Sequence, residues 1–142
     1  MKRILVGIDG SEQGWAALHR AGELAKATGS ALEIAHVIRP ITPALGVGDL
    51  TSAAVTWMME EEDYSRQLLR EAVARVKEFG VEVNTRSLVG SAAEELAELA
   101  RPDEVTMAVV GHRGRNLAAR LFLGSVADRL AQICSKAVLI VR

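Results

Sequence analysis

The sequence predicts an α/β fold in which a parallel sheet carries helices on both faces. Five short apolar or β-branched runs alternate with segments of helical period, which is typical of such a sheet. The chain has 142 residues, of which 49% are hydrophobic, enough for the core of one compact domain. Since no internal repeat, low-complexity segment or linker interrupts the pattern, we expect a single domain over residues 1–142.

Five strands are expected at residues 2–8, 31–38, 81–88, 106–110 and 137–141. The first helix ends near Gly29, and its apolar positions recur at helical spacing: Ala17, Leu18, Ala21, Leu24 and Ala25. A long helix follows the second strand and stops at Gly80. Its expected apolar face consists of Leu68, Leu69, Ala72, Val73, Val76 and Phe79. The acidic run at 60–63 is expected in its first turn, where carboxylates complement the helix dipole.

Two shorter helices and one long loop complete the pattern. Ser91 and Glu94 predict a capping box at the start of the third helix. The last helix opens at Gly124 and Ser125, and Cys134 belongs to its mostly apolar stripe, as a core residue rather than a reactive thiol. Residues 39–52 hold two of the three prolines and predict a loop. A binding lid and a disordered segment are both open interpretations of this loop.

Charge and cysteine content exclude several classes of protein. The 17 basic and 18 acidic residues give a net charge of −1, so no strong field favours nucleic acid or an anionic membrane. A single cysteine excludes an intrachain disulfide and a cysteine metal cluster, and it indicates a reducing compartment. The apolar start is too short for a signal peptide, and no run reaches the roughly 18 to 20 apolar residues of a membrane span. We therefore expect a cytoplasmic protein.

Two predicted strand ends carry unusual residues. In open parallel sheets, ligands bind outside the carboxyl ends of the strands. Gly7 to Ser11 follow the first strand, and Gly111 to Gly114 follow the fourth; after nine further residues, Gly124 and Ser125 open the last helix. Glycines admit a phosphate close to the backbone, and a helix N-terminus favours an anion. The pattern predicts a polyphosphate site, with mobile positive charge available from Arg113, Arg115 and Arg120.

Familiar phosphate-binding motifs do not account for this pattern. Neither G-x-x-x-x-G-K-[ST] nor a G-x-G-x-x-G after the first strand occurs, so a P-loop enzyme and a dinucleotide-binding Rossmann enzyme are unsupported. The motif G-x2-G-x9-G-[ST] does occur, at Gly111, Gly114, Gly124 and Ser125. With the opening segment at residues 4–11 and the closing segment at 124–142, it resembles the ATP-binding branch of the universal stress protein family. The resemblance implies a Rossmann-like sheet of order 3-2-1-4-5 with two helices on each face.

The family resemblance also implies residues that hold the nucleoside. Asp9, at the tip of the first strand, would lie against the nucleoside, and Ile8 would line the adenine pocket. Val37 would contact adenine through its backbone. Val110 and Gly111 would flank the ribose and the phosphates.

A second group of residues would hold the phosphates of ATP. Arg113 and Gly114 resemble positions on the family's phosphate loop. Gly124, Ser125 and Val126 would offer backbone N–H groups, and Ser125 also its hydroxyl. Mg²⁺ would be held mainly through the phosphates themselves.

Structural interpretations stand beside these roles. Asp9 with Glu12, and Ser125 with Asp128, have the spacing of helix capping boxes, and a cap and a ligand role can coexist. Exposed loop positions are the alternative for His112 and Arg113. The remaining histidines and the tryptophans are interpreted as structural residues: His19, His36, Trp15 and Trp57.

Two positions depart from the family pattern, which often has a small hydroxyl residue at His112 and an aspartate at Thr106. Neither change removes a backbone donor, so the departures bear on affinity and specificity.

The leading functional hypothesis is an ATP-binding regulatory module that changes its affinity for an unidentified protein partner. The alternatives are a slow ATPase or related adenylate-handling enzyme, and a nucleotide-free structural dimer. The sequence has no P-loop lysine, so fast phosphoryl transfer is unsupported. Residues 137–141 form an apolar strand at the predicted sheet edge, which invites pairing with a second copy. The family resemblance also implies a homodimer through this strand.

Overall fold

The computed structural model describes residues 1–41, 50–113 and 123–142, without the side chains of residues 50 and 51. Within these ranges five strands form one parallel sheet of order β3-β2-β1-β4-β5. The strands are β1 (Arg3–Gly7), β2 (Ala31–Ile38), β3 (Val83–Val89), β4 (Val105–Gly111) and β5 (Ala137–Val141). The predicted number and order of the strands are confirmed.

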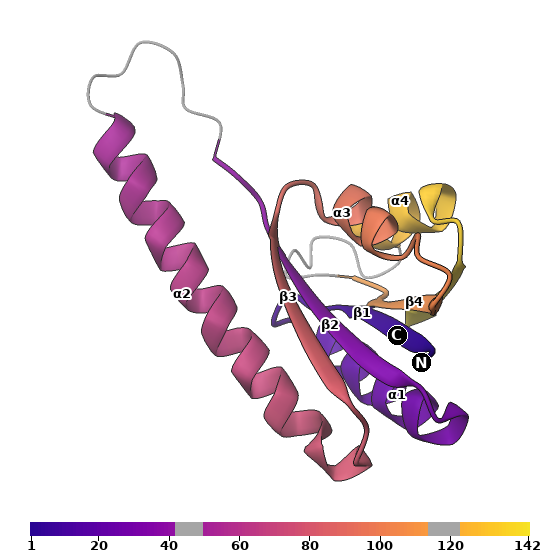
Figure 1. Cartoon of the computed structure of the whole chain (residues 1–142). Helices are drawn as coiled ribbons and strands as arrows, with labels where there is room; N and C mark the ends of the chain where they lie inside the picture. Colours follow the sequence, from indigo (N-terminus) through magenta and orange to yellow (C-terminus); the bar gives the residue numbers. More distant parts are fainter. Residues whose placement is uncertain (42–49, 114–122) are drawn as a thin grey trace.

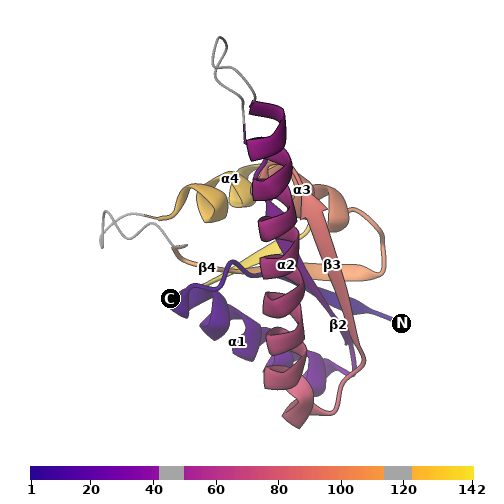
Figure 2. The same cartoon turned by 90° about the vertical axis from the view of Figure 1, so that its left-hand side faces the viewer.

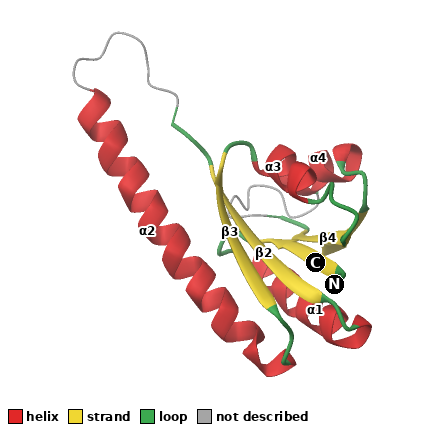
Figure 3. Ribbon diagram, viewed as in Figure 1, coloured by secondary structure: helices red, strands yellow, loops and turns green. Residues whose placement is uncertain are grey.

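Helices cover both faces of this sheet (Figure 1). On one face lie α1 (Glu12–Thr28) and α2 (Leu50–Val76), which continues into the 3₁₀ turn η1 (Lys77–Phe79). On the other face lie α3 (Ala92–Leu99) and α4 (Ser125–Ile133). Colouring by secondary structure shows the three layers, with the sheet between the two pairs of helices (Figure 3).

The central strands are buried on both faces, which explains their mostly apolar sequences. Ile4, Val6 and Ile34 pack under α1 and α2, whereas Leu5 and Ala108 pack under α3 and α4. Strand β2 is buried at seven of its eight positions. Strand β3, at the sheet edge, is exposed at five of seven.

Helix α1 begins two residues later than a capping box at Asp9 requires. Its N-cap is Ser11, whose Oγ accepts a hydrogen bond from the Gly14 N–H at 3.0 Å. The interpretation of Asp9 as N-cap with Glu12 is therefore wrong. The predicted C-terminus is correct, since Gly29 adopts φ +65° at the C-cap.

Helix α2 extends further toward its N-terminus than predicted. It begins at Leu50, so the acidic run at 60–63 lies in mid-helix rather than in the first turn. The preceding alanines, methionines and tryptophan continue the helix, and its first turns project beyond the sheet (Figure 2). Val73, expected on the buried face, is 39% exposed, whereas its neighbours Leu69 and Ala72 are buried. Of the predicted loop, residues 42–49 lie outside the described part of the chain.

The two shorter helices differ from their predicted caps. Ser91 is the N-cap of α3, but its Oγ donates to Glu94 Oε2 at 2.6 Å instead of satisfying a backbone N–H. Gly124 is the N-cap of α4, so Ser125 is the first helical residue and the proposed Ser125 cap is wrong. Asp128 Oδ2 instead accepts a hydrogen bond from Gln132 Nε2 at 3.1 Å.

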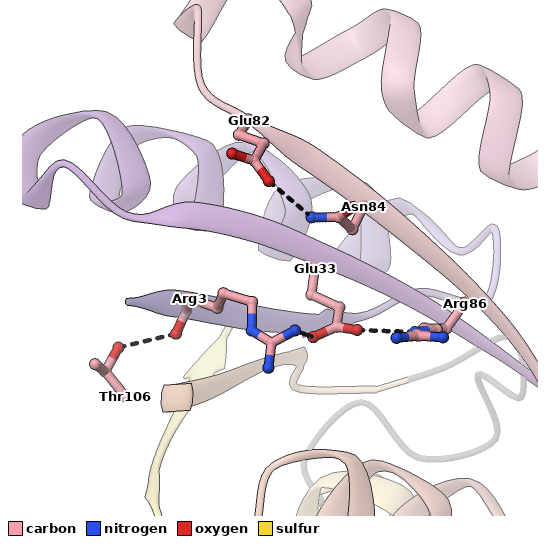
Figure 4. Close-up of polar contacts among 6 residues, drawn as sticks. All are labelled: Arg3, Glu33, Glu82, Asn84, Arg86 and Thr106. Carbon is pink, nitrogen blue, oxygen red and sulfur yellow. Dashed lines mark hydrogen bonds and ion pairs between the residues drawn. The ribbon is translucent and has the colours of Figure 1, made fainter. Parts of the chain in front are cut away.

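A buried carboxylate connects three strands. The Glu33 side chain on β2 is 1% exposed; its Oε1 accepts a hydrogen bond from Arg86 Nε of β3 at 3.0 Å, and its Oε2 lies 3.3 Å from Arg3 Nη1 of β1. Figure 4 shows this row, and beside it the Thr106 hydroxyl donating to the Arg3 carbonyl at 3.1 Å. A buried charge requires such partners, so the two arginines allow Glu33 to occupy the sheet.

Two further expectations concern single residues and the membrane. His36 is hydrogen-bonded, as expected of a structural residue, and is buried, and Cys134 packs half-buried against the core under α3 and α4. Among the described residues, no helix is both long and apolar enough to span a bilayer.

Candidate functional site

The carboxyl ends of the three central strands, β2, β1 and β4, lie side by side at the same end of the sheet. Val6 pairs with Val109 across β1 and β4, and Gly7 pairs with Ala35 across β1 and β2. Because the strands are parallel, the residues after these pairs end side by side. The structure thereby brings together Ile8 and Asp9, which follow β1, with Val37 from β2 and with Val110 and Gly111 from β4.

Asp9 is held by the turn into α1. Its Oδ1 accepts hydrogen bonds from the Ser11 N–H at 3.0 Å and from the Ser11 hydroxyl at 2.5 Å. A Cβ on Gly14 would lie 2.9 Å from the same oxygen. The carboxylate is therefore fixed at the tip of β1 against the first turn of α1.

Tyr64 of α2 reaches this turn from the neighbouring layer. Its hydroxyl donates to the Asp9 carbonyl at 3.4 Å, and its ring meets the His36 ring edge to face, with centroids 5.8 Å apart. Gly10 adopts φ +82°, and a Cβ there would collide with the Tyr64 hydroxyl. Tyr64 thus lies against the ends of both β1 and β2.

A chain of hydrogen bonds attaches α2 to the ends of β2 and β3. His36 Nδ1 lies 2.9 Å from Ser65 Oγ, which lies 2.7 Å from Ser87 Oγ. Ser65 is fully buried and His36 is nearly so. These bonds satisfy the polar groups between α2 and the sheet.

Gln13 links α1 to the end of β4. Its Oε1 accepts a hydrogen bond from the Arg113 N–H at 2.6 Å. A Cβ on Gly111 would lie 2.8 Å from the Gln13 carbonyl carbon, so packing of α1 alone already requires glycine there. The Arg113 Nε and Nη1 atoms are buried and have no hydrogen-bond partner within the described residues.

Backbone hydrogen bonds place the start of α4 beside the end of β4. The Gly124 N–H donates to the His112 carbonyl at 2.8 Å, and the His112 N–H donates to the Val141 carbonyl at 2.6 Å. Ser125 is exposed and Val126 half-buried in the first turn of α4. Gly114, the second glycine of the motif, lies outside the described residues.

Sequence reasoning missed Gln13 and Tyr64. Gln13 lies 100 positions from Arg113, and Tyr64 lies 55 positions from Asp9. Both are ordinary residues of amphipathic helices, and no local signal marks them. Only the packing of α1 and α2 on the sheet gives them their positions.

An open parallel α/β sheet, with glycines and a helix N-terminus at its central strand ends, defines a Rossmann-like protein. The model of the Universal stress protein family matches residues 1–142. YxiE, a universal stress protein of Bacillus subtilis, is 30% identical over 152 residues, covering 99% of this chain and 98% of that protein. The chain belongs to the universal stress protein family, so the predicted family is confirmed.

Solved structures agree with this assignment. UspA from Lactobacillus plantarum superposes with a TM-score of 0.89 at 20% identity, over 99% of this chain and 97% of that one. A universal stress protein crystallised in complex with cAMP superposes with a TM-score of 0.74 at 32% identity, again over 99% and 97%. The first similarity concerns the fold, whereas the second also extends to the sequence.

Proposed function

We propose that this protein binds an adenine nucleotide, with ATP as its ligand, and acts as a regulatory protein of the stress response in the cytoplasm. The base and ribose lie over the ends of β1, β2 and β4, and the phosphates lie at the start of α4. One observation carries the proposal. The turn at Asp9, Gly111 and the N-terminus of α4 lie together at the carboxyl ends of the central strands.

Three features of the chain suit a nucleotide at this edge. Asp9 is fixed where it can face a ribose hydroxyl, and Val37 supplies backbone surface for the base. The Ile8 side chain, expected to line the adenine pocket, is 5% exposed and packs in the core under α1 and α2. The first turn of α4 offers N–H groups to an anion. Ser125 is not the cap of its own helix, so its hydroxyl is available to a phosphate oxygen.

The Arg113 guanidinium supports the phosphate end of the proposal. Its Nε and Nη1 are withdrawn from solvent without a hydrogen-bond partner among the described residues. Guanidinium donors bind phosphate oxygens in fixed geometry, so an anion beside Arg113 satisfies them. With ATP bound, Mg²⁺ is held mainly through the phosphates themselves. The phosphates in turn contact Gly114, Gly124, Ser125 and Val126.

The similar protein solved with cAMP supports an adenine ligand. ATP is proposed here because three glycines and a hydroxyl are spaced for a polyphosphate. We expect turnover slower than about one per second, because efficient phosphoryl transfer needs a positioned base and dense positive charge.

Gly124→Val tests the proposal by calorimetric titration with ATP and with cAMP. A side chain at the N-cap of α4 crowds the phosphates, so we expect ATP affinity to fall at least about tenfold with the fold retained by circular dichroism. Ser91→Val, which places the same side chain at the N-cap of α3, is the matched control and leaves ATP affinity unchanged. Equal ATP binding by Gly124→Val and the unmodified protein would contradict the proposal.

A further inference from the structure

Strand β3 leaves one side of its backbone unpaired. It is the last strand on its side of the sheet and pairs with β2 alone among the described strands. Leu32 N–H donates to the Glu82 carbonyl, and Gly90 N–H donates to the Ile38 carbonyl. In a parallel ladder the residues that bond to one neighbour alternate. Hence the N–H and C=O groups of the odd-numbered residues point to the open edge: Val83, Thr85, Ser87 and Val89.

This edge lacks the usual protection against strand addition. Edge strands are normally kept apart by lysine, proline, bulges or a very short length. Strand β3 has seven residues, pairs in continuous register, and contains neither lysine nor proline. Its one charged residue, Arg86, is bound to Glu33 on the sheet face. Another extended chain can therefore pair with this edge.

A groove runs between the open edge and α2. It is lined by Arg66, Leu69, Arg70, Val73 and Thr85 and has a volume of about 360 Å³. That volume is within the range of roughly 300 to 1,000 Å³ typical of ligand sites. Figure 1 shows α2 alongside β3, on the side away from β5. Side chains of an added strand that point toward α2 would enter this groove.

Two arginines, Arg66 and Arg70, line the helix wall of the groove. Arg66, Arg70 and Lys77 lie on one stripe of α2 and η1 with Val73, at spacings of 4, 3 and 4. Asp63 neutralises Arg66, but Arg70 is exposed and makes no ion pair with any described residue. A carboxylate on an added strand can pair with Arg70 while an apolar neighbour contacts Val73. Charge and shape together favour an acidic, extended segment.

We propose that the β3 edge and the adjoining face of α2 bind an extended, acidic peptide segment of a partner protein as a sixth strand. Main-chain hydrogen bonds to β3 supply affinity, and Arg70 with Val73 selects acidic and apolar side chains. The site lies at the opposite sheet edge from β5 and uses none of the residues proposed to bind the nucleotide.

Fluorescence polarisation with the full chain tests this proposal. The probe is a labelled nine-residue peptide of alternating valine and glutamate, and a valine–lysine peptide is its charge control. We expect saturable binding of the glutamate peptide below about 1 mM and at least tenfold weaker binding of the lysine peptide. No binding of the glutamate peptide at that concentration, or equal binding of both peptides, overturns the proposal.

Two variants and one control substitution separate edge pairing from other modes of binding. Thr85→Pro removes an outward N–H without touching the ladder to β2, so we expect at least tenfold weaker binding, whereas Thr85→Val retains the N–H and full affinity. Arg70→Glu tests the contribution of charge to binding. It lies on the exposed surface of the helix, so it serves even if the proline variant fails to fold. It should reverse the preference between the two peptides. Unchanged binding by Arg70→Glu contradicts the proposal. Self-association that Thr85→Pro abolishes would assign the edge to a second copy instead.

Discussion

At the scale of single residues, Gly10 and Tyr64 show how a turn at a strand end depends on a distant helix. Gly10 has φ +82°, in the region that favours glycine, and the Tyr64 hydroxyl occupies the space that a Cβ would need. The next nearest tyrosine atom to that Cβ, Cζ, is 3.7 Å away, which is ordinary contact. The backbone conformation and the hydroxyl therefore disfavour a side chain at Gly10 for separable reasons.

Gly10→Ala is expected to destabilise the fold through both effects. The left-handed conformation costs about 1–2 kcal/mol for a residue with a Cβ, and the collision with Tyr64 adds to it. In a Tyr64→Phe background the collision disappears, so Gly10→Ala should there cost only the conformational part. Urea denaturation of the four proteins in this cycle measures the difference. Equal costs in both backgrounds would show that the hydroxyl is not the obstacle.

At the scale of elements, charged side chains connect neighbouring strands and neighbouring helices in addition to hydrophobic packing. Glu33 connects β1, β2 and β3 through Arg3 and Arg86. Glu94 connects two helices, since its Oε2 accepts from the Ser91 hydroxyl and its Oε1 accepts from Arg129 Nε of α4 at 3.0 Å. The first carboxylate is buried and the second is exposed, so their contributions to stability differ.

Glu33→Gln is expected to lower the free energy of unfolding by about 1.5–3 kcal/mol, the range for hydrogen bonds to a charged group. It leaves Arg3, only 27% exposed, beside a neutral side chain. Arg86→Met should cost less, because the Arg86 side chain is 55% exposed and Glu33 keeps Arg3 as a partner. Chemical denaturation measures both changes in the free energy of unfolding, provided that its dependence on denaturant concentration, the m-value, is unchanged. A larger loss for Arg86→Met than for Glu33→Gln would contradict this account.

The contribution of Glu94 to the stability of the fold depends on pH. The Ser91 hydroxyl and then the Arg129 guanidinium hold the pKa of Glu94 below its ordinary value of 4.5. A carboxyl whose pKa is lowered by folding stabilises the fold above its unfolded-state pKa, and this stabilisation is lost as the pH falls through the folded-state pKa. We expect Glu94→Gln to lower Tm at pH values above 4.5, and the difference from the unmodified protein to vanish once the pH falls below the lowered pKa of folded Glu94.

Glu98→Gln is the matched control for the Glu94 prediction. Glu98 lies on the same helix and pairs only with nearby Arg101 among the described residues. It makes no link to α4, so its substitution should change Tm less at neutral pH. If Glu94→Gln lowers Tm equally at neutral and acidic pH, the link from α3 to α4 is not electrostatic.

At the scale of the whole molecule, the two sheet edges differ in composition. Strand β5 reads AVLIV and is half-buried at four positions, whereas β3 reads VNTRSLV and is mostly exposed. An apolar edge suits a second copy of the same chain, because a twofold axis pairs both copies in one closed step. The proposed homodimer therefore uses β5, and the proposed peptide site uses β3.

The hydrogen bonds of β5 show which positions test this dimer. The His112 N–H donates to the Val141 carbonyl, so by alternation Leu139 also bonds to β4, whereas the N–H groups of Val138 and Ile140 point outward. Val138→Pro should convert a dimer of about 30 kDa, twice the chain mass of 15.2 kDa, into a monomer by light scattering. Leu139→Pro breaks the ladder to β4 and should lower Tm. A 15.2 kDa particle for the unmodified protein at micromolar concentration would contradict the dimer.

The sequence by itself determined the sheet and the family. Residues 31–38 and 137–141 were predicted with their observed bounds, because a strand packed against helices gives a short, mostly apolar run. Gly29 and Gly80 marked helix ends because both positions adopt φ +65°. The motif from Gly111 to Ser125 identified the family because it lies on consecutive local segments of one chain.

Tertiary structure alone decided the caps and the surroundings of the site. Ser11 caps α1 instead of Asp9, whose Oδ1 accepts a hydrogen bond from the Ser11 N–H, and Gly124, whose N–H donates to the His112 carbonyl, caps α4 instead of Ser125. Tyr64 meets Asp9 and Gln13 meets Arg113 only after α1 and α2 pack on the sheet. Local patterns record which face of an element is buried, but contacts across 55 or 100 positions depend on how separate elements pack together.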